Sequence, residues 1–357
     1  MRRVNRLLIG TSLGLFLFII LYILIVLFSD TGRFEDPALE AAVHSALEEE
    51  GRHVSRTELQ RITSLDASER GIENLKGIKS LPNLASLDLS GNRIRDLSPL
   101  AELQRLNSLN ISNNNIQDLE AVRLDALSNL PELRELEIAN NRGPSHPENP
   151  GEHRRISTID VLSDFTELER LNLSFNHIED VGALSGLSRL RYLNLRGNRL
   201  SENAISPLSE LSMLEELNLR DNDLRRIDEL ESLTSLRYLN LHSNERIESI
   251  LPLAHLHSLE TLILRRVPVE DEVRILAELT NLRRLNLRET GIGELDVLAE
   301  LMEQGALQDD PQKDIFAQVD IRENPISETS DDPAAGYGVL QEYWENIALR
   351  RPQELPE

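Results

Sequence analysis

Leucine and isoleucine residues recur along most of this chain at an uneven but regular spacing. In the stretch LASLDLSGNRIRDLSPL, which begins at Leu84, they are separated by gaps of three, two, five, three and three. The gap of two predicts a short strand, because alternate side chains of a strand point to the same face. Leu87 and Leu89 would then be buried, while Asp88 points the other way. The later gaps of three predict a turn-like or short helical return.

The same pattern restarts about every 22 residues, as from Leu84 to Leu106 and from Leu168 to Leu190. A fixed period of about 20 to 29 residues with the pattern L-x-x-L-x-L-x-x-N-x-L is typical of leucine-rich repeats. Each unit is too small to bury its own leucines, so neighbouring units must stack and share one core. We therefore predict an α/β leucine-rich repeat solenoid of about eleven repeats, curved, with a parallel sheet on its concave face. The repeats start at Ile62, Leu84, Leu106, Leu133, Leu168, Leu190, Leu214, Leu236, Leu259, Leu282 and Phe316.

An asparagine follows the second strand leucine by three positions in most repeats. An amide side chain carries both donors and an acceptor, so it can satisfy the backbone of a tight turn. Stacked copies would form a ladder along the solenoid. We assign this structural role to Asn92, Asn114, Asn141, Asn176, Asn198, Asn222, Asn244 and Asn324.

The beginning of the chain predicts a membrane segment. Residues 7–28 contain no charged side chain and, as a helix, would rise about 33 Å, close to the roughly 30 Å hydrocarbon core of a bilayer. Arginines precede this stretch and acidic residues dominate just after it. By the positive-inside rule we expect residues 1–6 to form a basic cytoplasmic tail and residues 7–28 a single transmembrane helix of the cytoplasmic membrane. The repeat domain would lie outside, in the periplasm or on the cell surface.

The two ends of the repeat array need covers, because a terminal repeat exposes half of the shared core. After a linker at residues 29–35, Asp36 and Pro37 are typical of a helix start, and residues 36–61 predict a helical N-terminal cap. The repeats then occupy residues 62–326, and residues 327–357 predict a C-terminal helical cap and tail. Insertions near residues 142–155 and 302–315 break the period, and both predict exposed loops.

Composition excludes several classes of function. The 357-residue chain has a formal net charge of −23, which argues against nucleic acid as a partner, because a phosphate-binding surface must first overcome that repulsion. No cysteine is present, so disulfides and thiolate sites are impossible. The pairs His255 with His257 and His146 with His153 lack the carboxylates that would complete a metal site. No catalytic motif stands out, so we expect no enzyme activity, no metal and no cofactor.

The stretch PALEAAVHSALEEEGRHVSRTELQRITSLDASERGIENLKGIKSLPNLASLDLSGNRIRDLSPLAEL, which starts at Pro37, resembles the N-terminal cap and first repeats of bacterial internalin-like leucine-rich repeat proteins. These share the 22-residue unit with phosphatase-regulating leucine-rich repeat proteins of eukaryotes. The resemblance extends over about residues 36–326 and implies the repeat fold. The N-terminal apolar stretch departs from the usual internalin arrangement, so the resemblance does not imply host-cell invasion.

Two sets of outward strand positions predict a binding face. The column just after the second strand leucine is small and neutral in the first repeats and becomes basic in the later ones. Arginine and tyrosine are enriched at binding hot spots, and a guanidinium forms paired bonds with carboxylates or phosphates. Duplication of an arginine-containing repeat would produce the same column without a function, since the chain holds 35 Arg and 3 Lys. The predicted partner-binding residues are Tyr192, Arg196, Arg220, Tyr238, His242, Arg265, Arg284, Arg288 and Arg322.

These features predict a membrane-anchored protein–protein interaction module of the bacterial envelope, which binds a protein partner with an acidic surface on its concave face. A glycan or another anionic polymer is the alternative ligand. A second hypothesis is a structural scaffold of an envelope complex, for which the concave face would be unimportant. A third is an adaptor like the eukaryotic phosphatase regulators, which requires the reversed membrane topology. The partner's identity and the oligomeric state do not follow from the sequence.

Overall fold

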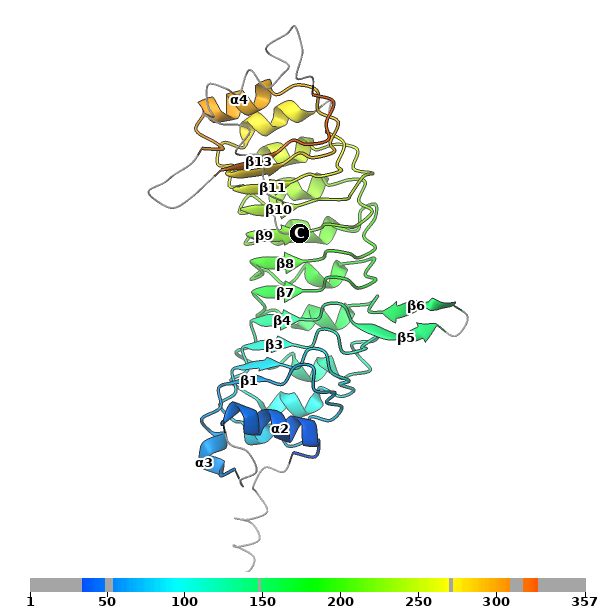
Figure 1. Ribbon diagram of the computed structural model, residues 1–357, viewed down its shortest axis with the longest axis vertical. Helices are drawn as coiled ribbons and strands as arrows, with labels where there is room; N and C mark the ends of the chain where they lie inside the picture. The colour runs from blue at the N-terminus through cyan, green and yellow to red at the C-terminus, as the bar shows by residue number, and fades with distance from the viewer. Residues whose placement is uncertain (1–33, 49–53, 147–148, 270–271, 309–316, 327–357) are drawn as a thin grey trace, which may run out of the picture.

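The computed structural model describes residues 34–48, 54–146, 149–269, 272–308 and 317–326. Its repeats stack into an elongated, curved column, with α2 (Pro37–Ala46) and α3 (Arg56–Leu59) at the N-terminal end and α4 (Asp296–Glu303) at the opposite end (Figure 1). This is the predicted repeat solenoid.

Eleven strands form one parallel sheet, and neighbours in the sheet come from successive repeats. The pairing is in register, so that Leu87 lies between Leu65 and Leu109 and equivalent repeat positions stand in columns. The predicted number of repeats and the parallel sheet are therefore confirmed. The strands are β1 (Ser64–Asp66), β2 (Ser86–Asp88), β3 (Ser108–Asn110), β4 (Glu135–Glu137), β7 (Arg170–Asn172), β8 (Tyr192–Asn194), β9 (Glu216–Asn218), β10 (Tyr238–Asn240), β11 (Thr261–Ile263), β12 (Arg284–Asn286) and β13 (Gln318–Asp320).

Short 3-10 helices carry the chain back to the start of the next strand. Their spacing of three residues per turn matches the apolar gaps of three, and residues such as Leu100 and Leu208 point into the core. Leu87 and Leu89 are buried as well, whereas Asp88 between them lies on the outer face of the sheet. The return segments are η1 (Ile78–Ser80), η2 (Ser98–Glu102), η3 (Leu124–Leu127), η4 (Asp160–Asp164), η5 (Gly182–Leu184), η6 (Ser206–Glu210), η7 (Asp228–Ser232), η8 (Leu251–His255) and η9 (Val273–Glu278).

Two helices cover the first repeat. Asp36 precedes α2 (Pro37–Ala46) and accepts a hydrogen bond from the Ala38 N–H at 2.9 Å. Its other carboxylate oxygen accepts from the Glu73 N–H at 2.9 Å, which fixes the helix to the first repeat. The helix α3 (Arg56–Leu59) begins with a capping box in which Ser55 and Glu58 satisfy each other's backbone N–H groups.

No helix in the ranges that the structure describes is long and apolar enough to cross a bilayer. The predicted transmembrane helix at residues 7–28 and the predicted C-terminal cap at residues 327–357 lie outside those ranges.

From Asn92 to Asn244 the asparagine column forms a ladder of hydrogen bonds in the core, which Val267 and Thr290 interrupt before Asn324. Asn198 Nδ2 donates to the carbonyls of Leu195 in its own repeat and Leu173 in the preceding one, at 2.9 and 3.1 Å. Its Oδ1 accepts from the Ile178 N–H at 3.1 Å. Since Leu173 also accepts from Asn176, each rung shares a carbonyl with the next.

The first insertion differs from the predicted loop. Residues Arg142–His146 and Asn149–Arg155 form the antiparallel hairpin β5–β6, which projects from the side of the column (Figure 1). Irregular register along this pair accommodates the proline residues, which cannot donate to a ladder. Because the chain leaves the stack here, the buried Asn176 Oδ1 has no hydrogen-bond partner in the described structure.

At the third position after every strand of the large sheet, the residue adopts the left-handed conformation. Only Gly91 and Gly197 are glycine, the residue that adopts a positive φ without a steric penalty. The side chains of the other nine turns are therefore held at the edge of the sheet face. These residues are Glu69, Asn113, Asn140, Phe175, Asp221, Ser243, Arg266, Glu289 and Glu323.

Candidate functional site

The predicted partner-binding residues all lie on the outer side of the sheet, in two columns. Tyr192, Tyr238 and Arg284 stand at the starts of β8, β10 and β12. Neighbouring strands are about 4.8 Å apart, so Tyr192 and Tyr238, two strands apart, are separated by about 10 Å, while Arg284 lies another two strands away. The second column follows the strand ends and consists of Arg196, Arg220, His242, Arg265, Arg288 and Arg322.

Carboxylates pair with the arginines of this second column. Arg196 and Arg220 both contact Asp221, with Nε to Oδ2 distances of 3.1 and 3.2 Å. Arg322 contacts Asp320 at 2.7 Å. The predicted basic stripe is thus neutralised along much of its length, and its attraction for an acidic partner is correspondingly reduced.

Glu289 is the centre of the largest of these ion-pair groups. Its two carboxylate oxygens accept hydrogen bonds from Arg266 at 2.7 Å and from Arg265 at 3.1 Å. These bonds hold the pKa of Glu289 at about 2. Arg288 also contacts Glu289, and its Nη2 pairs with Glu323 of the next repeat. Most of these carboxylates occupy the left-handed turn position, which directs them towards arginines of neighbouring repeats.

His242 takes the place of an arginine in the middle of this column. It is only 7% exposed and lies two residues after the end of β10, between Arg220 and Arg265 of the flanking repeats. Burial, together with the charges of Arg220 and Arg265, lowers the pKa of His242 to about 4, while Asp221 opposes them. His242 therefore places a neutral side chain between Arg220 and Arg265, where an arginine would place a third cation.

Replacing His242 with glutamine is expected to remove a pH dependence of stability. The pKa of His242 is about 4 in the folded chain, against a reference value of 6.5. As pH falls from 6.5 towards 4, the unfolded chain takes up a proton that the folded chain does not, so the wild type loses stability. We expect this loss to be roughly 1–3 kcal/mol larger in the wild type than in His242→Gln. Urea unfolding at pH 7 and pH 4.5 measures both, and an equal loss in the two chains would contradict the assignment.

Asparagine side chains in the column between the two strand leucines fix the backbone at the ends of the strands. The Oδ1 atoms of Asn194, Asn218 and Asn286 accept hydrogen bonds from the backbone N–H two residues later, at 3.0–3.1 Å. The Nδ2 group of such a side chain is left for contacts across the sheet face. Asn172 Nδ2, for example, donates a hydrogen bond to Glu137 at 2.7 Å. This column offers a ligand fixed donors between the aromatic and basic columns.

Two cation–π pairs connect β7 and β8. At the strand starts, the Arg170 guanidinium lies 4.2 Å from the centroid of the Tyr192 ring. Beyond the strand ends, the Arg196 guanidinium lies 4.9 Å from the centroid of the Phe175 ring. The Phe175 ring also covers Gly197, where an added Cβ would meet it at 2.8 Å. We call Arg170, Tyr192, Phe175 and Arg196 the central block.

The central block contains exposed aromatic chemistry that is rare elsewhere in the part of the chain that the structure describes. The described residues include five aromatic side chains, of which Phe34 and Phe165 belong to the core. The other three, Phe175, Tyr192 and Tyr238, lie within the consecutive repeats of β7–β10, and Phe175 is 37% exposed. Burial raises the pKa of the Tyr192 hydroxyl, so this group stays protonated and available as a donor.

Sequence reasoning missed two members of this block. Arg170 occupies the same column as Tyr192 and Tyr238, so the column itself contained the signal. Phe175 occupies a turn position where the neighbouring repeats place Asn140 and Gly197. A bulky aromatic residue at such a position was the second signal.

Within the ranges that the structure covers, no three histidine, aspartate or glutamate side chains gather where they could hold a metal ion. The described face therefore offers aromatic rings, amides and paired charges, which suit recognition of another surface.

Comparison with known proteins identifies the repeats. The family described as Leucine Rich repeats (2 copies) matches residues 60–102, 166–213 and 212–255, and the family described as Leucine rich repeat matches residues 82–142. The structure of an internalin C2 from Listeria monocytogenes is 31% identical in sequence, with a TM-score of 0.54, and the match covers 63% of this chain and 92% of that chain.

Two further solved structures share the fold. An internalin (inlF) of Listeria monocytogenes is 24% identical, with a TM-score of 0.52, over 82% of this chain and 91% of that chain. A leucine-rich repeat protein of Leptospira interrogans is 23% identical, with a TM-score of 0.56, over 76% of this chain and 75% of that chain. Among curated proteins, the sequence comparison gave no match.

Proposed function

Because this chain belongs to the internalin-like leucine-rich repeat proteins, we propose that it binds a protein partner on the outer face of its sheet. Leucine-rich repeat proteins of this kind are generally binding modules without enzymatic activity, and no catalytic family is indicated by the comparisons. The array presents its strand columns side by side on one continuous surface, which suits recognition of an extended protein surface.

The observation that carries this proposal is the gathering of non-core aromatic residues on one part of the sheet. Phe175, Tyr192 and Tyr238 supply rigid apolar area, and Arg170 and Arg196 hold two of the rings in place. Tyrosine and arginine near the centre of an interface commonly dominate its binding energy. We therefore place the main affinity on the central block and Tyr238.

The arginine column has a supporting role in this proposal. An acidic partner would have to replace Asp221, Glu289 and Glu323 as the counterions of Arg220 and Arg288. Such an exchange of one ion pair for another adds specificity more readily than affinity. The bound surface therefore needs apolar groups for the aromatic rings, and its acidic groups would be limited to those that reach the arginines.

We also propose that residues 7–28 anchor the protein in the cytoplasmic membrane, with the repeat domain outside. The support is the uncharged 22-residue stretch with arginines on one side and acidic residues on the other. Protease accessibility of the repeats in intact cells and in inverted membranes tests this topology. Cleavage in inverted membranes alone would favour the adaptor hypothesis.

Changing Tyr192 and Tyr238 together to alanine is expected to weaken partner binding about 10- to 100-fold, because two anchors of the interface are truncated. The full chain, extracted from membranes in mild detergent, is used to capture partners from host membranes. The dissociation constant of each captured protein is then measured with the purified chain and with the double variant.

A matched control removes apolar side chains elsewhere. Met213 and Leu251 are exposed; Met213 lies on the segment that leads to β9, and Leu251 is the first residue of η8. Their double alanine variant should bind as the wild type does. If this variant lost the partner and the tyrosine variant kept it, the binding surface would be the side of the column formed by the return segments. The scaffold hypothesis would then replace the proposal.

A further inference from the structure

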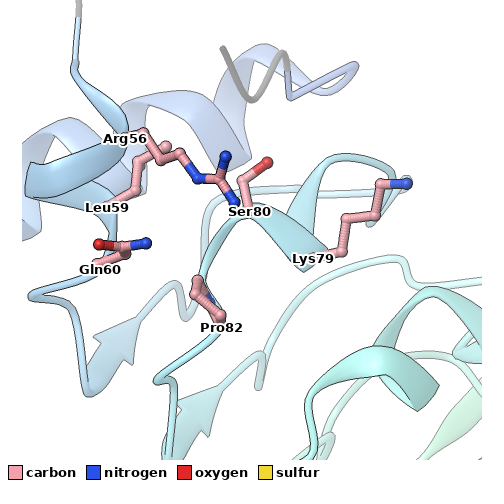
Figure 2. Close-up of a pocket in the computed structure, with 6 residues that line it drawn as sticks. All are labelled: Arg56, Leu59, Gln60, Lys79, Ser80 and Pro82. Atoms are coloured by element: carbon pink, nitrogen blue, oxygen red, sulfur yellow. The ribbon is translucent and has the colours of Figure 1, made fainter. Parts of the chain in front are cut away.

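A pocket of about 240 Å³ lies at the N-terminal end of the repeat array, far from the central block (Figures 1 and 2). It opens between α3 and the segment that contains η1. Its lining residues are Arg56, Leu59, Gln60, Lys79, Ser80 and Pro82.

The walls of this pocket are fixed by the fold. Asn83 Nδ2 donates to the Gln60 carbonyl at 2.8 Å, which ties the segment after η1 to the end of α3. Leu59 anchors α3 in the core, and the Ser55–Glu58 capping box fixes its first turn. The pocket therefore exists before any ligand arrives.

The polar groups of the pocket are mostly donors. The Arg56 guanidinium, the Ser80 hydroxyl and the Gln60 amide all line the pocket (Figure 2). The Lys79 ammonium points away from Arg56 in this view, at the end of a flexible four-carbon stem that can turn towards a ligand.

These two cations differ from those of the sheet face. In the described part of the chain, neither Arg56 nor Lys79 has a carboxylate within 4.0 Å, whereas the nearby Lys76 pairs with Glu35 at 3.3 Å. Glu58, the nearest acid along α3, accepts hydrogen bonds from the Ser55 N–H and Oγ at 2.7 and 2.6 Å. An unpaired guanidinium, an ammonium, a hydroxyl and an amide together match the acceptors of a phosphate group.

We propose that this pocket binds a phosphate-bearing anion. Its place in the chain favours a lipid headgroup as the source, and this part of the inference rests on the proposed membrane anchor. The five residues 29–33 separate the apolar stretch from the first described residue and span at most about 18 Å. The N-terminal end of the array would then stand close to the bilayer surface. A soluble phosphate or phosphate ester is the other source of the same chemistry.

Lysine acetylation measures occupancy of the pocket in the full chain. The chain holds only 3 Lys, so mass spectrometry resolves the acetylation rates of Lys79 and Lys76 separately, and Lys76 serves as the internal standard. One arm uses the chain in a phosphate-free nonionic detergent, with and without inorganic phosphate. The other arm compares the chain reconstituted in vesicles of phosphatidylglycerol and of digalactosyldiacylglycerol, which contains no phosphate.

We expect phosphatidylglycerol to slow acetylation of Lys79 relative to Lys76 by about fivefold. Arg56→Gln should abolish this protection, whereas Arg105→Gln, the same charge change on an exposed residue outside the pocket, should preserve it. Protection by inorganic phosphate alone would keep the pocket as a phosphate site and assign it to a soluble ligand.

Absence of protection in both arms, or equal protection in Arg56→Gln, would overturn the phosphate site. Neither result affects partner binding by the sheet face, which the tyrosine variants measure independently.

Discussion

Leu217→Ala is expected to lower the free energy of unfolding by about 3–5 kcal/mol. Leu217 is the inward residue of β9 and is 0% exposed, and its register partners Leu193 and Leu239 are fully buried as well. Truncation therefore leaves a cavity that two neighbouring repeats line. Because each repeat contacts only its neighbours, no other part of the chain can move in to fill this space.

Leu251→Ala is the matched control for this variant. Leu251 begins η8 and is 53% exposed, so the same truncation should cost less than about 0.5 kcal/mol. Urea unfolding followed by circular dichroism measures both. A loss below about 1 kcal/mol for Leu217→Ala would mean that the strand leucines do not form the shared core described above.

Asn198→Ala is expected to cost about 3 kcal/mol, an effect similar to that of a core truncation. The change removes the acceptor of the Ile178 N–H and leaves that donor buried without its partner. It also removes donors to the Leu173 and Leu195 carbonyls. Each of these two carbonyls still accepts a hydrogen bond from another asparagine, Leu173 from Asn176 and Leu195 from Asn222, which limits the loss of stability.

Asn176→Ala provides an internal comparison on the same ladder. Asn176 has the same Nδ2 bonds, but its Oδ1 has no partner in the described structure. Its replacement removes an unsatisfied buried acceptor together with the hydrogen bonds that Nδ2 donates. The decrease in the free energy of unfolding should therefore be smaller than for Asn198→Ala by about 1 kcal/mol. Equal losses for the two variants, measured by urea unfolding under identical conditions, would show that the Oδ1 bonds contribute nothing.

The fold was predictable because its determinants are local and repeated. The gap of two between strand leucines and the period near 22 residues predict which side chains are buried. The same alignment places Tyr192, Tyr238 and the arginine column on the outer face, where the structure has them. Periodicity thus determines the side of the sheet on which a residue stands.

The interactions across that face were not predictable in the same way. Arg196 and Asp221 are 25 residues apart, and Arg288 and Glu323 are 35 apart. Each pair joins a strand-end position to a turn position of the next repeat. The sequence columns, read one at a time, therefore predicted a basic stripe where the structure has paired charges. The left-handed backbone of the turns, which directs these acids, was also invisible in the leucine pattern.

The insertion after Asn141 was recognisable from its proline and glycine content, but not its hairpin form. Antiparallel pairing of Arg142 with Arg155 depends on both ends of the insertion leaving the stack together. A composition-based prediction of a loop contains no information on such pairing.

The hairpin β5–β6 also marks the position after Asn141 as a site at which a foreign peptide can be inserted. The sheet stays in register across the insertion, since Leu136 of β4 pairs with Leu171 of β7. The hydrogen bond that the insertion displaces is the one that Asn176 Oδ1 lacks. A foreign peptide with hairpin-forming ends, exchanged for residues 143–154, would be displayed at the side of the column, and Arg155, whose Nη1 donates to the Phe175 carbonyl at 2.7 Å, would be kept. The insertion site thus lies at the side of the column, apart from the sheet face that we propose binds the partner.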